Sequence, residues 1–183
     1  MTGFLKRAGL LVFAVISGLL VLVGILYICG FRINSSGSIP IGLYWLTKRP
    51  LQKSEYVLLC PPDEPLFKEA LKRGYLSKGF CALGSSPLMK RVLATSGDSV
   101  LINQHGVWVN NHFIAHSRPF QKDDKGRLLP QLNQQYLLND SQVLLMTDQS
   151  EFSFDARYFG LLNRLTIQAV IKPVLVWKST FIK

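Results

Sequence analysis

Two polar residues in unusual surroundings are the features of this sequence that could do chemistry. Ser38 lies in a run rich in serine, glycine and proline, Asn34-Ser-Ser-Gly-Ser-Ile-Pro40. Lys90 lies inside the apolar run Leu88-Met-Lys-Arg-Val-Leu93. A serine hydroxyl is a weak nucleophile that needs a base, and a lysine desolvated by apolar neighbours can stay neutral and act as that base. The pair therefore outlines a serine–lysine hydrolase.

Each residue also has an ordinary interpretation. A serine in a glycine- and proline-rich segment is commonly only a turn residue. A lysine among aliphatic residues can extend its amine to solvent and bury only its methylene groups. On a strand, Lys90 would share one face with Leu88 and Val92, which would give its amine apolar neighbours. These two residues alone leave both interpretations open.

A third polar segment, Ser153-Phe-Asp-Ala-Arg157, follows an apolar run at residues 142–146. Asp155 and Arg157 stand two residues apart, so they can pair with each other or brace separate strands. An ordinary surface ion pair is the alternative. The specific feature is the order of a turn serine, an apolar-embedded lysine and this segment along one chain. Elements far apart in sequence have to bring the three together.

The element before the serine turn is an uncharged apolar run from Ala8 to Ile28. Its 21 residues would form a helix of about 31 Å, close to the thickness of a bilayer's hydrocarbon core. A cleaved signal peptide usually has an apolar part of only about 7–15 residues and a small-residue cleavage site, which is absent here. We therefore predict an uncleaved transmembrane anchor. Lys6 and Arg7 precede the run and only Arg32 closely follows it, so the positive-inside rule puts the N-terminus in the cytoplasm.

The chain carries a formal net charge of +10, from 21 basic and 11 acidic residues. The basic residues are scattered, without a dense run or a recognisable nucleic-acid module, so we expect membrane lipid rather than nucleic acid as the anionic partner. His105, His112 and His116 surround a predicted hairpin. Pro119 and the pair Asn110-Asn111 argue against a helix that would align two of these histidines, so we expect no metal and no cofactor.

The chain contains three cysteines. Cys29 lies at the predicted membrane boundary, whereas Cys60 and Cys81 lie in the exported part. In an oxidising compartment these two would close a loop and add about 3 kcal/mol by the chain-entropy estimate. Two free buried thiols are the alternative. Given the predicted topology, we favour the disulfide.

The rest of the chain predicts a mostly-β domain. A short helix is expected after Asp63, with Asp63 as its N-terminal cap, Pro65 in its first turn and Gly74 at its end, inside the loop that the cysteine pair would close. The polar stretch 121–135 predicts an exposed loop, and Pro173 favours an edge position for the last strand. We find no repeat and no second domain, so the expected organisation is a cytoplasmic tip and anchor at 1–30 and one periplasmic domain at 31–183. Strands are predicted at residues 55–60, 88–94, 99–102, 107–109, 112–114, 142–146 and 169–177.

Three segments, in this order behind an N-terminal anchor, resemble the type I signal peptidases, which are serine–lysine leader peptidases. Ser36-Gly-Ser-Ile-Pro40 matches the nucleophile box of that family. Lys90-Arg91, followed by Ser96-Gly-Asp98, matches its lysine box. Asp148 together with residues 153–160 matches its C-terminal box. The resemblance covers essentially the whole chain and implies a signal-peptidase-like β domain.

Within that family, the chain is most similar to the TraF-type peptidases of conjugative plasmid transfer. Ser38-Ile-Pro-Ile-Gly-Leu-Tyr44 fits their Ser-x-Pro-x-Gly-x-Tyr pattern. The single anchor, the cysteine pair around a helix and Arg73-Gly-Tyr75 also suit this subgroup. The chain departs from the family at Met146-Thr-Asp-Gln149, where Gly-Asp-Asn is usual, and at Ala156, where serine is common.

The resemblance also implies roles for individual residues. Ser38 would attack the scissile carbonyl and Lys90 would accept its proton, while the Ser36 hydroxyl and the Ser38 backbone N–H would form the oxyanion hole. Ser153 would hold the lysine amine. In the housekeeping enzymes, the residue that corresponds to Asp155 supports the structure through an arginine. In the TraF-type group, the corresponding residue is regarded as catalytic, together with the serine and the lysine. The implied set is Ser38, Lys90 and Asp155 as catalytic residues, with Ser36, Ser153 and Arg157 in support.

By the same resemblance, the substrates are exported precursor proteins with small residues at the first and third positions before the cleavage site. A pilin precursor, cut and released linear or cyclised, is the implied substrate, and the bacterial inner membrane is the implied location. A general housekeeping signal peptidase is one alternative. A non-catalytic, membrane-anchored assembly factor of a conjugation or secretion channel is a second, and a basic DNA-contacting transfer factor is a third.

Overall fold

The computed structural model of this chain describes residues 2–177. Met1 of the predicted tip and anchor, and residues 178–183 of the predicted domain, lie outside the described residues. Most of the described chain beyond the N-terminal helix is strand and turn, as predicted. The elements are α1 Thr2–Ile28, β1 Phe31–Asn34, β2 Gly42–Thr47, β3 Tyr56–Leu59, α2 Pro65–Arg73, β4 Leu88–Ala94, β5 Ser99–Asn103, β6 Gly106–Val109, β7 His112–Phe113, β8 Gln134–Leu137, β9 Gln142–Met146, α3 Ala156–Phe159, β10 Leu162–Asn163, the 3-10 helix η1 Arg164–Thr166 and β11 Ile167–Val176.

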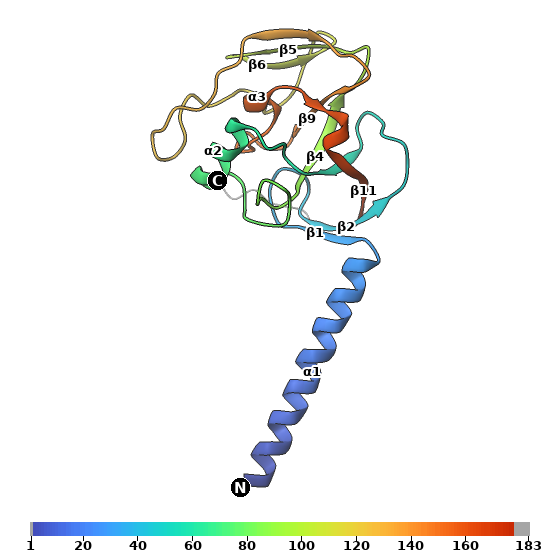
Figure 1. The fold of residues 1–183 in the computed structure, drawn as a ribbon. Coiled ribbons are helices and arrows are strands. Elements are labelled where there is room, and N and C mark those ends of the chain that lie inside the picture. The colour runs from blue at the N-terminus through green and yellow to red at the C-terminus, as the bar shows by residue number, and fades with distance from the viewer. Residues whose placement is uncertain (1, 178–183) are drawn as a thin grey trace.

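Helix α1 extends away from the β domain as a long rod and meets it at β1 (Figure 1). From Lys6 to Ile28 it is long and apolar enough to cross a membrane, as the uncharged run predicts. The helix ends at Ile28, and the turn that follows contains Gly30, whose φ of 94° lies in the left-handed region that only glycine adopts without strain. Strand β1 starts directly afterwards, so no flexible linker separates the helix from the domain.

Two antiparallel sheets form the domain, and Figure 1 shows the smaller one at the end opposite α1. The larger sheet has seven strands in the order β1-β2-β11-β3-β4-β9-β10, and the smaller has four in the order β7-β6-β5-β8. Strands β1 and β2 form a hairpin in which Asn34 pairs with Gly42, leaving residues 35–41 as its loop. This loop thus lies at the β1 edge of the larger sheet. A short turn connects β4 of the larger sheet to β5 of the smaller sheet.

Strands β4 and β9 lie at the centre of the packing because both of their faces are covered. On one face, Val92 and Leu145 pack into the cluster that includes Phe67 of α2. On the other face, Leu144 and Met146 pack against the smaller sheet. Strands buried on both faces are expected to be continuously apolar, which makes the lysine within β4 an exception.

The disulfide-closed loop is confirmed. Cys60 and Cys81 are bonded, with Cα atoms 5.6 Å apart, and the loop between them contains α2. Gly74 ends α2 with a φ of 84°, as predicted. The prediction that Asp63 caps this helix is wrong: Glu64 is the N-cap residue, and the Asp63 carboxylate pairs with Lys68 at 2.9 Å.

Two further sequence expectations differ from the structure. The region expected to be loop ends in β8, because Tyr136 pairs with Val100 and packs on the core of the smaller sheet. Strand β11 is not an edge strand, since it lies between β2 and β3. Its Pro173 pairs with Tyr44 of β2, whereas β3 pairs only with residues 167–171. At Pro173 the strand therefore has a neighbour on one side only, which is a position where the absence of a backbone N–H is tolerated.

Candidate active site

The serine turn is the loop of the β1–β2 hairpin, and one buried side chain organises it. Asn34, only 4% exposed, ends β1. Its Nδ2 donates to the carbonyls of Ser36 at 2.8 Å, Ile39 at 2.9 Å and Pro40 at 3.1 Å. Its Oδ1 accepts from the backbone N–H of Ser36 at 3.2 Å. These bonds satisfy the polar backbone of a loop that has no strand partner, and they fix the chain on both sides of Ser38.

The residues of the Ser-x-Pro-x-Gly-x-Tyr pattern have physical roles around this loop. Tyr44 is fully buried, and its hydroxyl donates to the Pro40 carbonyl at 2.6 Å. Gly42 lies so close to the backbone carbonyl of Leu175 on β11 that a side chain at this position would collide with it. The pattern thus anchors the far end of the loop to the sheet, and glycine is required where β2 and β11 approach.

Lys90 is buried within β4, with 2% of its surface exposed. It shares a face with the core residue Val92, as alternation along the strand predicts. Burial lowers the pKa of its amine to about 8, although the Asp155 carboxylate raises that pKa and the Arg157 guanidinium lowers it. A lysine with this pKa is neutral in a useful fraction of molecules near neutral pH. The Lys90 amine therefore does not extend into solvent, which was the alternative interpretation.

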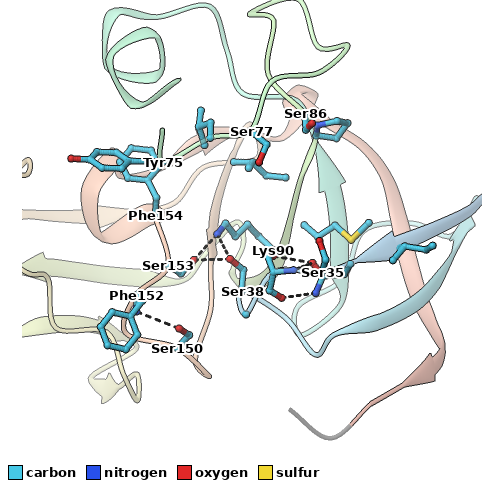
Figure 2. Close-up of a pocket in the computed structure, with 18 residues that line it drawn as sticks. Ser35, Ser38, Tyr75, Ser77, Ser86, Lys90, Ser150, Phe152, Ser153 and Phe154 are labelled. Atoms are coloured by element: carbon cyan, nitrogen blue, oxygen red, sulfur yellow. Dashed lines mark hydrogen bonds between the residues drawn. The ribbon is translucent and has the colours of Figure 1, made fainter. Parts of the chain in front are cut away.

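The side chains of Ser38 and Ser153, from two other segments of the chain, meet at this amine, and Figure 2 shows the three converging. The Nζ of Lys90 lies 2.9 Å from Ser38 Oγ and 2.6 Å from Ser153 Oγ. The two hydroxyl oxygens are 3.0 Å apart. The geometry is therefore a closed triangle of one amine and two hydroxyls, with every edge at hydrogen-bond distance. Ser38 also has the base within reach that a serine nucleophile needs.

Asp155 and Arg157 lie one step away from this triangle. Both are fully buried, and they pair twice, with Nε to Oδ1 at 2.8 Å and Nη2 to Oδ2 at 3.0 Å. Asp155 also accepts from the backbone N–H of Thr147 at 3.2 Å. Its hydrogen bonds thus run to Arg157 and to the end of β9. It influences Lys90 through its charge rather than by direct contact.

Arg157 holds the turn that carries Ser153. Its guanidinium donates to the carbonyls of Ser150 at 3.0 Å and Glu151 at 2.9 Å, and to that of His116 at 2.7 Å in a distant loop. The fork of fixed donors suits this task because one side chain can serve several acceptors at once. Asp155 and Arg157 pair with each other, as their spacing allows. Arg157 also connects this turn to His116, which lies 41 residues earlier in the sequence.

Ser36 lies beside the triangle without joining it. Its hydroxyl donates to Asn34 Oδ1 at 2.9 Å, so its proton is engaged with Asn34. To donate to an oxyanion, this hydroxyl would have to rotate away from Asn34. The backbone N–H of Ser38, by contrast, has no acceptor among residues 2–177. Of the two expected oxyanion donors, only the backbone group is free.

The triangle lies in the wall of an open cavity of about 720 Å³. The serine turn and β4 supply one side, and the aromatic residues Tyr75 and Phe154 lie opposite, as Figure 2 shows. These two rings are 5.5 Å apart. Tyr75 is further held by a 2.5 Å hydrogen bond from its hydroxyl to Asp123. An open cavity of this size can receive a ligand beside Ser38.

Comparison with known proteins identifies the family of this chain. The sequence model of a family described as signal peptidase, peptidase S26, matches residues 5–177. The chain belongs to this peptidase family. The resemblance to the signal peptidases, inferred from the three motifs, is therefore confirmed.

Individual relatives of this S26 peptidase are conjugation proteins. It is 45% identical over 180 residues to a plasmid transfer protein TraF of Escherichia coli, covering 97% of this chain and 100% of the relative. It is 33% identical over 156 residues to a conjugal transfer protein TraF of Agrobacterium tumefaciens strain 15955, covering 81% and 84%. Among solved structures, a signal peptidase I of Enterococcus faecalis V583 aligns with 68% of this chain and 98% of its own, at 12% identity and a TM-score of 0.37.

Sequence reasoning missed Asn34 and Tyr44 as builders of the S26 site. Tyr44 stands inside the matched motif and Asn34 lies two residues before it, so a signal existed. An asparagine directly before a serine- and glycine-rich turn commonly binds backbone groups two residues on, as Asn34 binds Ser36. The Arg157 contacts with residues 116, 150 and 151 had no such signal, because they join segments that only the fold brings together.

Proposed function

We propose that this S26 peptidase is a membrane-anchored serine endopeptidase that cleaves leader sequences from exported proteins by a Ser38–Lys90 dyad. The observation that carries the proposal is the triangle of Lys90, Ser38 and Ser153 in the wall of an open cavity. Membership of a signal peptidase family supports the reaction type. Because the similar proteins are named for plasmid or conjugal transfer, we propose a conjugative pilin precursor as the substrate.

The reaction begins with neutral Lys90. Its lone pair accepts the Ser38 proton while Ser38 Oγ forms a bond to the scissile carbonyl carbon. The protonated amine then gives the proton to the leaving nitrogen as the C–N bond breaks. Water, activated by the same amine, releases the acyl group from Ser38. A cyclic pilin would need a cut on its C-terminal side: the pilin would then be the acyl group on Ser38, the C-terminal segment would be the leaving amine, and the pilin's own amino terminus, in place of water, would attack the ester carbonyl and release the ring from Ser38.

The developing oxyanion requires donors. The free backbone N–H of Ser38 supplies one, and the Ser36 hydroxyl supplies the second once it turns from Asn34. Each donor of this kind contributes about 3 kcal/mol to transition-state stabilisation. In this scheme Asp155 and Arg157 are positioning residues, which hold the Ser153 turn and adjust the charge near the lysine.

We further propose that α1 crosses the inner membrane once, with the N-terminus in the cytoplasm and the domain in the periplasm. The length of the apolar helix and the basic residues Lys6 and Arg7 support this orientation. The nucleophile turn follows the helix by ten residues. Cleavage would occur close to the membrane surface, where leader cleavage sites emerge. The proposed specificity is for small residues at the first and third positions before the cleaved bond.

The test is co-expression of the full chain with a candidate pilin precursor, followed by the mass of the pilin product. Ser38→Ala and Lys90→Met remove the nucleophile and the base, and methionine keeps the length of a buried apolar chain. Ser35→Ala is the control, since Ser35 lies in the same turn and lines the same cavity without contacting Lys90. We expect processing to stop in the first two variants and to continue in the control.

Other outcomes would favour other functions. Processing that persists in both active-site variants would overturn the dyad, and normal plasmid transfer with Ser38→Ala would indicate a non-catalytic assembly factor. Complementation of a strain that lacks its own leader peptidase would indicate a general signal peptidase. The product mass distinguishes a linear pilin from a cyclic one, which is lighter by one water.

A further inference from the structure

A second groove lies where α1 joins the β domain, and it shares no lining residue with the cavity that holds the triangle. It measures about 1070 Å³ and includes Cys29 and Gly30, the residues that end the helix. Strand β2 supplies Trp45 to its wall, and η1 and β11 supply the other side. The residues that give it its charge are Lys48, Arg49, Arg164 and Lys172.

The groove is strongly basic and lacks compensating charge. Its lining contains four basic residues and no aspartate or glutamate. None of the four forms a salt bridge within residues 2–177, and Arg164 donates only to the backbone carbonyl of Asp140. Four like charges around one groove repel each other, so an anion bound there would lower the electrostatic free energy.

The groove is fixed to the membrane end of α1. The indole N–H of Trp45 donates to the Cys29 carbonyl at 3.0 Å, and the Leu46 N–H donates to the Gly30 carbonyl at 2.9 Å. Across the strands, Lys172 pairs directly with Trp45. These contacts tie the charged lining to the end of the helix, so the groove cannot move away from the plane where the helix leaves the bilayer.

That plane determines the occupant. The apolar segment Lys6–Ile28 has 23 residues and would span about 35 Å, so Cys29 and Gly30 would lie at the level of the lipid headgroups. Trp45 is half-exposed beside them, and tryptophan is enriched at this interface. A nucleic acid would be repelled here by the anionic lipids around the helix, whereas a lipid phosphate is already present at this depth.

We propose that this groove binds the phosphate headgroup of an anionic phospholipid from the outer leaflet of the membrane that α1 crosses. The inference rests on the anchoring proposed above. The bound headgroup would neutralise the four charges and hold the β domain at one height and one rotation over the membrane, with the catalytic cavity facing a fixed direction. The ligand class is a phosphodiester with a net negative charge, such as phosphatidylglycerol.

The experiment measures which lipid touches Trp45 in the full chain. Trp108→Phe and Trp177→Phe leave Trp45 as the sole tryptophan of the three. The protein is reconstituted in phosphatidylcholine vesicles that contain equal mole fractions of either brominated phosphatidylglycerol or brominated phosphatidylcholine. We expect brominated phosphatidylglycerol to quench the fluorescence at least threefold more strongly, and high salt to reduce the difference, since salt screens exposed charges.

The test variant K48Q/R49Q/R164Q/K172Q should lose this preference. The control K72Q/R118Q/K122Q/K125Q removes the same charge from residues outside the groove lining and should keep it. Equal quenching by both lipids in the starting protein, or equal loss in both variants, would overturn the inference. Loss of the preference with millimolar soluble glycerol phosphate would indicate a free anion as the ligand, and loss with a short DNA duplex would indicate nucleic acid; either result overturns the lipid assignment.

Alkaline extraction of the same vesicles separates this inference from the proposed function. A chain released by carbonate is not inserted, which overturns the anchoring and this inference together. A chain that stays inserted and shows no lipid preference overturns the groove inference alone. Neither result depends on cleavage of a substrate.

Discussion

Ser153 Oγ lies closer to Lys90 Nζ, at 2.6 Å, than Ser38 Oγ, the proposed nucleophile, does at 2.9 Å. A neutral amine has two N–H donors and one lone pair. If one N–H donates to Ser153, the lone pair is free to face Ser38. The third residue of the triangle therefore sets the direction of the base, and the Arg157 contacts with the neighbouring turn hold that residue in place.

Ser153→Ala should lower kcat by about 10–100-fold with little change in KM, because the substrate does not depend on this hydroxyl for binding and proton transfer does. Steady-state kinetics of the full chain on a leader peptide measure both constants. Ser77→Ala is the control, since Ser77 lines the same cavity without a bond to Lys90. An unchanged kcat in Ser153→Ala would show that the amine is oriented without it.

Activity should rise with pH through the pKa of Lys90, which burial lowers to about 8. The active form is the neutral amine, so kcat/KM should fall about tenfold per unit below that pKa, or about 100-fold between pH 9 and pH 6. A pH profile of kcat/KM, with circular dichroism to verify the fold at each pH, measures it. A midpoint near 6.5 would instead indicate that one of the three histidines acts as the base.

Asp155→Asn should affect both stability and the pH profile. The fully buried Arg157 would lose its counter-charge, which costs about 3–5 kcal/mol of unfolding free energy. Because the Asp155 charge raises the pKa of Lys90, its removal should move the midpoint of activity to lower pH. Asp148→Asn is the matched control: its pair with Arg91 is partly exposed, so we expect a loss below about 1 kcal/mol and no shift. A destabilised Asp155→Asn with an unmoved midpoint would leave Asp155 a purely structural residue.

Asn34→Ala should loosen the nucleophile turn. Three carbonyls would lose their shared donor, at a cost of about 1–3 kcal/mol for the buried acceptor among them. We expect kcat to fall more than KM rises, because Ser38 would no longer be held at the base. Thermal unfolding and steady-state kinetics measure the two effects, with the exposed Asn133→Ala as control. Full activity in a destabilised Asn34→Ala would mean that the sheet alone positions the turn.

The sequence was sufficient for the parts of this site that depend on local pattern. Alternation placed Lys90 on the face of Val92, and the turn residues located the loop around Ser38. Gly74 ended α2 as glycine commonly does. Such features depend on neighbours within a few residues, so the chain itself specifies them.

Features that depend on distant partners could not be predicted in this way. The polar residues Gln134 and Gln135 end the segment that the sequence predicts as loop, yet pairing with β5 makes them the start of β8. The last strand was expected at an edge, but β2 and β3 enclose most of it. The residue types suggested the pair of Ser38 and Lys90, but the contact of Ser153 with Lys90 was predicted only from the family resemblance, since separate segments of the fold create it.

The direct passage from α1 into β1 has a consequence for how the enzyme finds its substrate. Only Cys29 and Gly30 lie between the end of α1 at Ile28 and the start of β1 at Phe31, so under the proposed anchoring Ser38 shares the lateral diffusion of α1 in the membrane. A precursor still tethered by its leader moves in the same plane. Encounter is then a search in two dimensions, and its rate depends on copies per area of membrane rather than on concentration in a volume.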